Sequence, residues 1–460
     1  MLHATFIGHQ GWLLSSGGTH VLVDPLLTQG FGHGGLAGSV FPPRDFDFER
    51  MPSIDAVWLT HEHDDHVCFP SLCRLDRAVK IYVSSRSSAA LSGALEDLGF
   101  DVTRVHPGAT VQVGSLVFQA LVADHRATPF ADEWDVLPFL ATDASREAGF
   151  ASSVDVPMPD ALLDAVAASQ LKRWLLCIAN NSTDVRFVHD GIGPLTPTDD
   201  TDALAKVLGK RWRNAASRAG EPCFTAITGG GWSHPVDVAW IDGLAFCIDP
   251  ERLARELSEA CSARVCAMRP GEGVALGVDC LEQTRSDWLR TVPTSRPAAA
   301  TTTVPHAIAP ASGRLRLCTD DWAALETGLE DLAGFLFGRD LFLAAHSVSR
   351  CDPALGMLLH DEGGDRTYVW SPPRGTFVRG DIGACSCRLR LWASDFLALV
   401  EGRIGPSALC YTGRVRCLNR DPDSVRVSPQ ILWLFAHPLH RPGPARRLYD
   451  ASASAGRRRG

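Results

Sequence analysis

The sequence predicts a layered α/β domain followed by a smaller α+β domain. Short runs rich in Val, Ile, Phe and Thr recur before residue 291 and are separated by Gly, Pro or Asp, as expected for buried strands. Helical segments are interleaved with them. A stretch dominated by Pro, Ala, Thr and Ser at residues 291–312 then interrupts the pattern. Such a composition cannot bury enough apolar surface to offset the entropy of ordering, so it indicates a linker.

The strand candidates are short and apolar, and the helix candidates are amphipathic. The strands are "HATFIG", "HVLVDP", "AVWLTH", "KIYVSS", "TVQVGS" and "LVFQALVA". Helices are expected at residues 88–100 and 159–174, and Pro159 suits a first helical turn because its missing N–H is not needed there. The apolar residues of the second helix share one face: Leu162, Leu163, Val166 and Ala167.

Composition and charge exclude several classes of protein. The chain has 460 residues, which is too long for one typical core. Because 45% of its residues are hydrophobic, it is too apolar to be disordered. A net charge of -9 and a pI near 6.0 argue against a nucleic-acid coat and favour a small-molecule substrate. No export signal and no apolar run near the ~18 residues of a membrane span are present. We therefore expect a cytoplasmic protein without integral membrane association, whose 14 cysteines are reduced.

The stretch "VWLTHEHDDHVCF" places His61, His63, Asp65 and His66 directly after an apolar run. In an extended chain, residues two apart point the same way, so His61 and His63 can bind one cation together. A turn after them can direct Asp65 and His66 to a second cation. Imidazole and carboxylate ligands suit Zn²⁺, Fe or Mn²⁺ rather than Ca²⁺ or Cu(I). The motif predicts two divalent metal ions, with zinc favoured and iron or manganese as alternatives.

The motif "THEHDDH" resembles the signature of the metallo-β-lactamase superfamily. Residues 6–27 are similar to the opening hairpin of its cytosolic metal-dependent hydrolase branch, with His9 before the first turn and Asp24-Pro25 after the second strand. The resemblance covers residues 1–245. It implies a four-layer αβ/βα sandwich with a two-metal site at one edge.

The resemblance also implies further ligands. The third histidine of the first metal corresponds to His125, with Glu133 as an alternative carboxylate. The bridging aspartate follows a strand and precedes a helix, which favours Asp155 over its rival Asp190. The last histidine corresponds to His234, in a glycine-rich segment that also resembles relatives of the CMP-sialate hydroxylase.

The superfamily supports two chemistries on one fold. In most members two metals convert water to hydroxide and hydrolyse an ester, amide or phosphodiester. In a minority two irons activate oxygen, which here would require a separate redox partner. We expect hydrolysis, with Asp65 taking the proton of the attacking water. A dinuclear iron oxygenase is the first alternative, and a non-enzymatic lipid-binding protein is the second.

The region after the linker is predicted to be an α+β domain. Residues 320–338 are apolar at helical spacing, which is typical of a helix packed on a core. Residues 386–419 resemble part of a sterol-carrier-type domain, which implies an apolar groove for an acyl- or lipid-like ligand. The expected division is a metallo-β-lactamase-like domain at 1–290, the linker at 291–312, an accessory domain at 313–437 and a basic flexible tail at 438–460.

Overall fold

The structure of the chain is a computed structural model. It describes residues 1–458 with gaps, and the residues outside the description are 34, 124–134, 181–187, 190–200, 230, 245–247, 278, 295–301, 306–307, 338–354, 372–373, 386, 419–429 and 459–460. Among the described residues, no helix combines the length and the apolar character needed to cross a bilayer.

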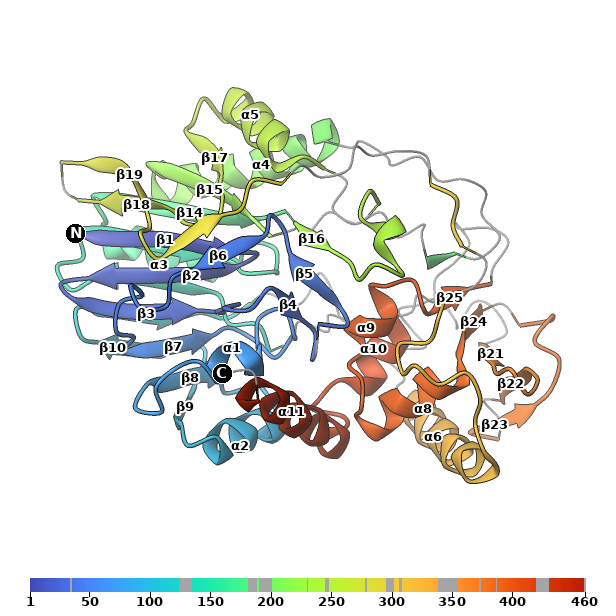
Figure 1. Cartoon of the computed structure of the whole chain (residues 1–460). Coiled ribbons are helices and arrows are strands. Elements are labelled where there is room, and N and C mark those ends of the chain that lie inside the picture. The colour runs from blue at the N-terminus through green and yellow to red at the C-terminus, as the bar shows by residue number, and fades with distance from the viewer. Residues whose placement is uncertain are drawn as a thin grey trace.

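Two large sheets form the N-terminal part of the molecule (Figure 1). The first has the order β19-β18-β1-β2-β3-β7-β8-β9 and the second β10-β11-β12-β13-β14-β15-β17. The first comprises Leu281–Arg285, Glu272–Leu276, Leu2–Gly8, Gly11–Ser16, Thr19–Val23, Ala56–Leu59, Lys80–Ser84 and Asp101–Val105. The second comprises Thr110–Val113, Leu116–Ala120, Phe139–Asp143, Ala148–Ser152, Arg173–Ala179, Phe224–Thr228 and Val265–Ala267.

Helices cover the outer face of each sheet. The helices α1 (Phe69–Leu72) and α2 (Ala89–Asp97) share an apolar cluster with the first sheet. The helices α3 (Asp160–Ser169), α4 (Thr201–Ala219) and α5 (Pro250–Cys261) share another with the second sheet. A third cluster, built on Trp12, Trp58 and Phe150, fills the space between the sheets. The order of layers is helix, sheet, sheet, helix, which confirms the predicted four-layer sandwich.

Two small sheets extend the sandwich. One joins β16 (Trp232–Ser233), β5 (Gly38–Val40) and β4 (Gly30–Phe31), and the other joins β20 (Leu289–Thr291) and β6 (Arg44–Phe46). The first brings Trp232 against Val40. Because β16 follows β15 of the second sheet, this pairing connects the second sheet to β5, which follows β3 in the chain.

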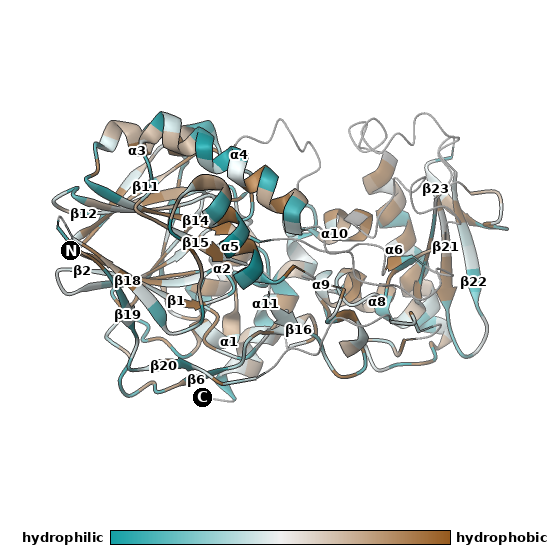
Figure 2. Ribbon diagram, turned by 90° about the horizontal axis from the view of Figure 1, so that it is seen from above, coloured by the Kyte–Doolittle hydropathy of each residue, from teal (hydrophilic) through white to brown (hydrophobic). Residues whose placement is uncertain are grey.

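The C-terminal region has a sheet of its own and lies beside one end of the sandwich (Figures 1 and 2). Its strand order is β23-β22-β21-β24-β25, with bounds Thr376–Arg379, Arg366–Ser371, Leu355–His360, Cys387–Trp392 and Arg416–Cys417. The helices α6 (Thr319–Phe337) and α8 (Ala393–Glu401) contact each other and strands of this sheet. The helix expected from residue 320 therefore forms, over Thr319–Phe337. Two further helices are α9 (Ser407–Cys410) and α10 (Gln430–Ala436).

The stretch predicted to be a flexible tail contains helix α11 (Pro442–Arg457), which lies against α1 and α2 of the N-terminal part (Figure 1). Its buried residues repeat at helical spacing: Ala445, Leu448, Tyr449, Ser452, Ala453 and Gly456. Small residues permit the close contact, because a Cβ on Gly456 would lie 2.9 Å from Pro70 Cα. The same Ala, Ser and Gly content that suggested a tail is what a tightly packed helix face uses here.

Candidate metal centre

The candidate site lies where strands of both sheets end. The strand β7 ends at Leu59 and leads into residues 60–66, here called the His-rich loop. The neighbouring parallel strand β3 ends just before Asp24. From the second sheet, β13 ends at Ser152 and leads to Asp155. Because the carboxyl ends of parallel strands meet at one edge of a sheet, residues distant in sequence converge here.

One group of possible ligand atoms comprises His61, His66 and Asp155, whose atoms all lie within 4.8 Å of one another. Oδ2 of Asp155 is 2.8 Å from Nε2 of His66 and 3.5 Å from Nε2 of His61. Three predicted ligands, including the predicted bridging aspartate, are thus brought together.

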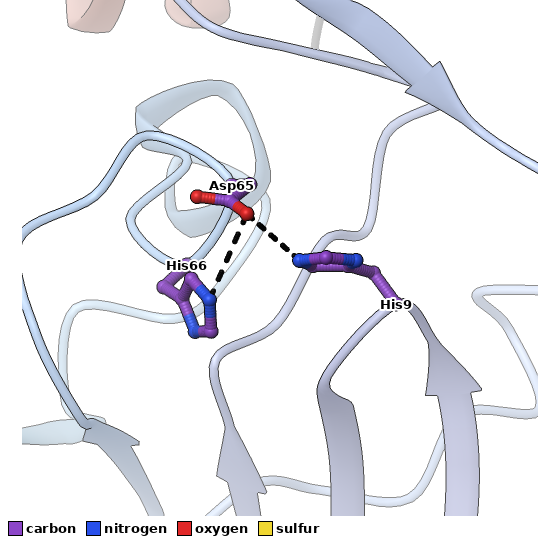
Figure 3. A group of neighbouring side chains, drawn as sticks. All are labelled: His9, Asp65 and His66. Carbon is purple, nitrogen blue, oxygen red and sulfur yellow. Dashed lines mark hydrogen bonds and ion pairs between the residues drawn. The ribbon is translucent and has the colours of Figure 1, made fainter. Parts of the chain in front are cut away.

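A second group comprises His9, Asp65 and His66 (Figure 3). Oδ2 of Asp65 is 2.8 Å from Nε2 of His9 and 3.7 Å from Nε2 of His66. His66 belongs to both groups, so the two form one continuous cluster of nitrogen and oxygen atoms.

The cluster fits a divalent metal ion. Nε2 of His61 is buried and makes no hydrogen bond to another described residue. The opposite nitrogens are held, since Nδ1 of His66 bonds to Asp24 Oδ2 at 2.8 Å and Nδ1 of His61 bonds to Thr60 Oγ1 at 3.0 Å. Holding Nδ1 in this way directs Nε2 inward as a ligand. Imidazole nitrogens with carboxylate oxygens suit Zn²⁺, Fe or Mn²⁺.

The protonation tendencies agree with a cation site. Burial, and then the neighbouring His66, lower the pKa of His61 well below its usual value. Burial opposes the charge of Asp155, but the adjacent His66 holds the pKa of that carboxyl well below its usual range. Burial also opposes the charge of His66, but the carboxylates of Asp155 and Asp65 raise its pKa well above normal. A positive charge is therefore favoured between these carboxylates, and a bound metal ion would replace the proton on His66.

The remaining predicted ligands do not belong to either group of ligand atoms within the described part of the chain. The ring of His63 lies 4.4 Å from that of His61, but His63 joins neither group of ligand atoms among the described residues. The structure does not bring His234 into either group, and its Nδ1 lies 2.7 Å from Asp242 Oδ1. The predicted ligand His125 and the alternatives Glu133 and Asp190 lie outside the described residues.

Two buried residues of the cluster were not proposed as functional from the sequence. His9 lies at the turn after β1, and Asp24 accepts hydrogen bonds from the Thr60 amide and hydroxyl at 2.8 and 2.6 Å as well as from His66. Both have positive φ values, 54° and 41°. A non-glycine residue in this conformation is uncommon and often marks a functional position. From the sequence, the available signal was a histidine between the glycines of "GHQG".

The C-terminal region covers the His-rich loop. Ser407 donates a hydrogen bond to Asp64 Oδ2, and the Tyr449 hydroxyl donates one to Glu62 Oε1 at 2.8 Å. The ring of Trp433 lies 5.4 Å from that of His63. A small cavity of about 40 Å³ remains between the two regions. Its lining includes His63, Asp64, Ile404, Trp433, Leu448 and Tyr449.

The buried carboxyl of Glu62 predicts a pH dependence of stability. Burial, and then the nearby Asp135 carboxylate, raise its pKa to about 7. A carboxyl whose pKa is higher in the folded than in the unfolded state binds more protons when folded, so stability falls as pH rises. For the metal-free protein we expect this loss between about pH 4.5 and about pH 7, amounting to at most about 3 kcal/mol from Glu62.

Urea unfolding of metal-free protein across this pH range measures the effect. Glu62→Gln keeps the size of the side chain and removes its titration, so its free energy of unfolding should change less with pH than that of the unmodified protein. Identical pH profiles for the two proteins would show that Glu62 does not titrate in this range.

Comparison with known proteins supports the family resemblance of the N-terminal part of the chain. Residues 19–171 match the family model described as the beta-lactamase superfamily domain, which confirms the resemblance for this part of the chain. The 4-amino-L-phenylalanyl-(CmlP-peptidyl-carrier-protein) 3-hydroxylase of Streptomyces venezuelae is 33% identical over 124 residues, which cover 25% of this chain and 22% of that protein. The chain spans only 22% and 49% of the length of the two curated relatives that it matches.

Solved structures align at low identity. Igni18, a metallo hydrolase from Ignicoccus hospitalis, is 17% identical with a TM-score of 0.37, covering 59% of this chain and 97% of that one. CmlA, a diiron β-hydroxylase from Streptomyces venezuelae, is 19% identical with a TM-score of 0.36, covering 62% of this chain and 54% of that one.

Proposed function

We propose that this beta-lactamase superfamily domain is a metal-dependent hydrolase acting on a small-molecule ester, amide or phosphodiester. The observation that carries the proposal is the meeting of the buried His61 and His66 with the partly buried Asp155, where Nε2 of His61 makes no hydrogen bond to a described residue and lies 3.5 Å from the carboxylate. A buried polar atom without a partner is costly unless something binds it. A metal ion supplies that partner.

The residues of the cluster would have distinct roles. His61, His66 and Asp155 would hold an ion, and Asp65 would complete the set from the other side of His66. A divalent ion bound in such a site lowers the pKa of a water molecule toward 7 and thereby supplies a nucleophile. The carboxylate of Asp65 lies in the same cluster, where it can accept the proton that this water loses.

The other residues keep the ligands in place. Asp24 orients His66 through Nδ1, and Thr60 contacts Nδ1 of His61 while donating to Asp24. Such supporting hydrogen bonds fix the ring orientation and the tautomer of a ligand histidine. The covering C-terminal residues reduce contact between this loop and solvent, which strengthens electrostatic interactions within the site.

An iron-dependent oxygenase is the second candidate. It is favoured by the 33% identity, over 124 residues, to a hydroxylase. It is also compatible with the ligand types, because histidine and carboxylate bind iron as well as zinc. An oxygenase would need electrons from a redox partner, whereas hydrolysis needs only water.

Metal analysis combined with two activity assays separates the candidates. Elemental analysis of the purified protein should find at least one tightly bound divalent ion per chain. Zinc or manganese, with metal-dependent hydrolysis of p-nitrophenyl acetate or bis(p-nitrophenyl) phosphate, is the expected result. Iron together with dioxygen uptake in the presence of ascorbate would favour the oxygenase. A folded protein that neither contains nor takes up metal would refute both.

A further inference from the structure

The tight turn between β1 and β2 brings two polar side chains to the two carboxylates of the cluster. This turn, residues 8–11, contains His9 at φ 54°. A Cβ on Gly11 would lie 3.0 Å from the Asp24 carbonyl oxygen, so the turn is tightly packed as well as conformationally restricted. A restricted conformation retained at a cluster of ionisable groups points to a function for the side chains that it presents.

The two ring nitrogens of His9 have different partners. The Trp232 indole donates a hydrogen bond from Nε1 to Nδ1 of His9 at 3.2 Å. An indole N–H can only donate, so Nδ1 must accept and carries no proton. The proton of the neutral ring is then on Nε2, which lies 2.8 Å from Asp65 Oδ2. His9 therefore donates a hydrogen bond to Asp65 (Figure 3).

This tautomer is the wrong one for metal binding through Nε2. A metal ligand must offer a lone pair, and in this tautomer Nε2 carries the proton instead. Moving the proton to Nδ1 would place two N–H groups face to face, because the indole of Trp232 also points its N–H there. The hydrogen bond would be lost within a buried environment, since Trp232 is 5% and His9 4% exposed.

We propose that His9 is a positioning residue that orients Asp65, and not a metal ligand, although its Nε2 belongs to one of the two candidate groups. The proposal rests on the proposed function in that Asp65 acts at the metal centre. It explains why an imidazole lies 2.8 Å from the carboxylate while its other nitrogen is occupied by a donor.

The neighbouring residue makes the corresponding contact to the second carboxylate. Gln10 donates from Nε2 to Asp155 Oδ1 at 3.2 Å, and its Oε1 accepts from Thr228 Oγ1 at 3.0 Å. Oδ2 of Asp155 is the oxygen that faces His66 and His61. The turn thus supplies one hydrogen-bond donor to each aspartate, in agreement with a positioning role for both residues.

The first test compares His9→Ala with His9→Gln. A glutamine amide can replace the donor N–H of His9 but is a poor substitute for a ligand imidazole. We expect His9→Ala to weaken zinc binding about 10- to 100-fold in competition with a chromophoric chelator. His9→Gln should restore most of the affinity, and the visible spectrum of its Co²⁺ form should match that of the unmodified protein. Equal loss of affinity in both variants, with an altered Co²⁺ spectrum, would show that His9 is a ligand.

The second test needs no metal and no activity. In metal-free protein, ¹H–¹⁵N correlation of the imidazole rings should show the His9 proton on Nε2, and Trp232→Phe should allow the Nδ1-protonated form to appear. For the zinc-affinity test above, His20→Gln is the matched control, because His20 bonds to Ser15 Oγ on the adjacent strand β2 and its replacement should leave zinc affinity unchanged. A proton on Nδ1 of His9 in the unmodified protein would overturn the proposal even if metal binds, whereas absence of metal binding would refute the proposed function alone.

Discussion

Replacing Asp155 by asparagine should weaken metal binding by more than about 100-fold and abolish metal-dependent turnover, while the protein remains folded. Oδ2 of Asp155 lies 2.8 Å from Nε2 of His66 and 3.5 Å from Nε2 of His61, so the change removes the negative charge that faces both Nε2 atoms. Asparagine is nearly the same size, and its Oδ1 can still accept the hydrogen bond from Gln10. The measurement is zinc affinity by chelator competition, with circular dichroism to establish folding.

Asp143→Asn provides the matched control. Asp143 is a buried aspartate at the end of β12 in the second sheet, but it accepts hydrogen bonds from the amides of Glu147 and Ala148 in its own turn. Its replacement should lower the free energy of unfolding by about 1 to 3 kcal/mol and leave zinc affinity unchanged. If Asp155→Asn lowered stability in the same way and kept its affinity for zinc, Asp155 would be a structural residue.

The sequence identified the part of the site that is local in the chain. His61, His63, Asp65 and His66 lie within six positions after one strand, and their spacing predicts one cation at His61 and His63 and a second at Asp65 and His66. The structure instead groups His61 with His66 and leaves His63 outside both groups of described ligand atoms. Asp155 was implied by the family resemblance, because the bridging aspartate of the family follows a strand and precedes a helix. The contribution of His9 was not predicted, because it depends on a contact over 56 residues and on Trp232, which lies 223 residues away. Only the folded arrangement, in which β16 pairs with β5 and the ring of Trp232 lies 5.5 Å from that of His9, brings these residues together.

The relation of the C-terminal region to the site could not be predicted either. Ser407, Trp433 and Tyr449 contact Asp64, His63 and Glu62 respectively. Each contact joins residues more than 300 positions apart, so no local pattern reveals it. The residues of the His-rich loop that do not face the metal cluster face the C-terminal region instead. The loop is therefore held from two sides, and the position of α11 affects it directly through Tyr449.

Replacing Gly402, which lies between α8 and α11, is expected to cause a large loss of stability. Gly402 ends α8 in the left-handed conformation, at φ 71°, and a Cβ there would lie 2.0 Å from the Pro444 carbonyl oxygen. Pro444 is in the first turn of α11. Gly402→Ala should lower the free energy of unfolding by about 2 to 5 kcal/mol, because the positive φ costs roughly 1 to 2 kcal/mol and the overlap with backbone adds a further 1 to 3 kcal/mol.

Gly313→Ala separates the two contributions. Gly313 has nearly the same φ, 70°, but a Cβ there would meet no atom within 4 Å. Gly313→Ala should therefore lose only the stability that the positive φ costs. The difference between the free energies of unfolding of the two variants, measured in urea, then gives the cost of the contact with Pro444. In Gly402→Ala the displaced helix should also lose the hydrogen bond from Tyr449 to Glu62, and amide hydrogen exchange in residues 445–453 should become faster, whereas Gly313→Ala should leave it unchanged. Equal losses of stability in the two variants, with unchanged exchange in α11, would show that the contact of Gly402 with Pro444 does not hold α11 against the His-rich loop.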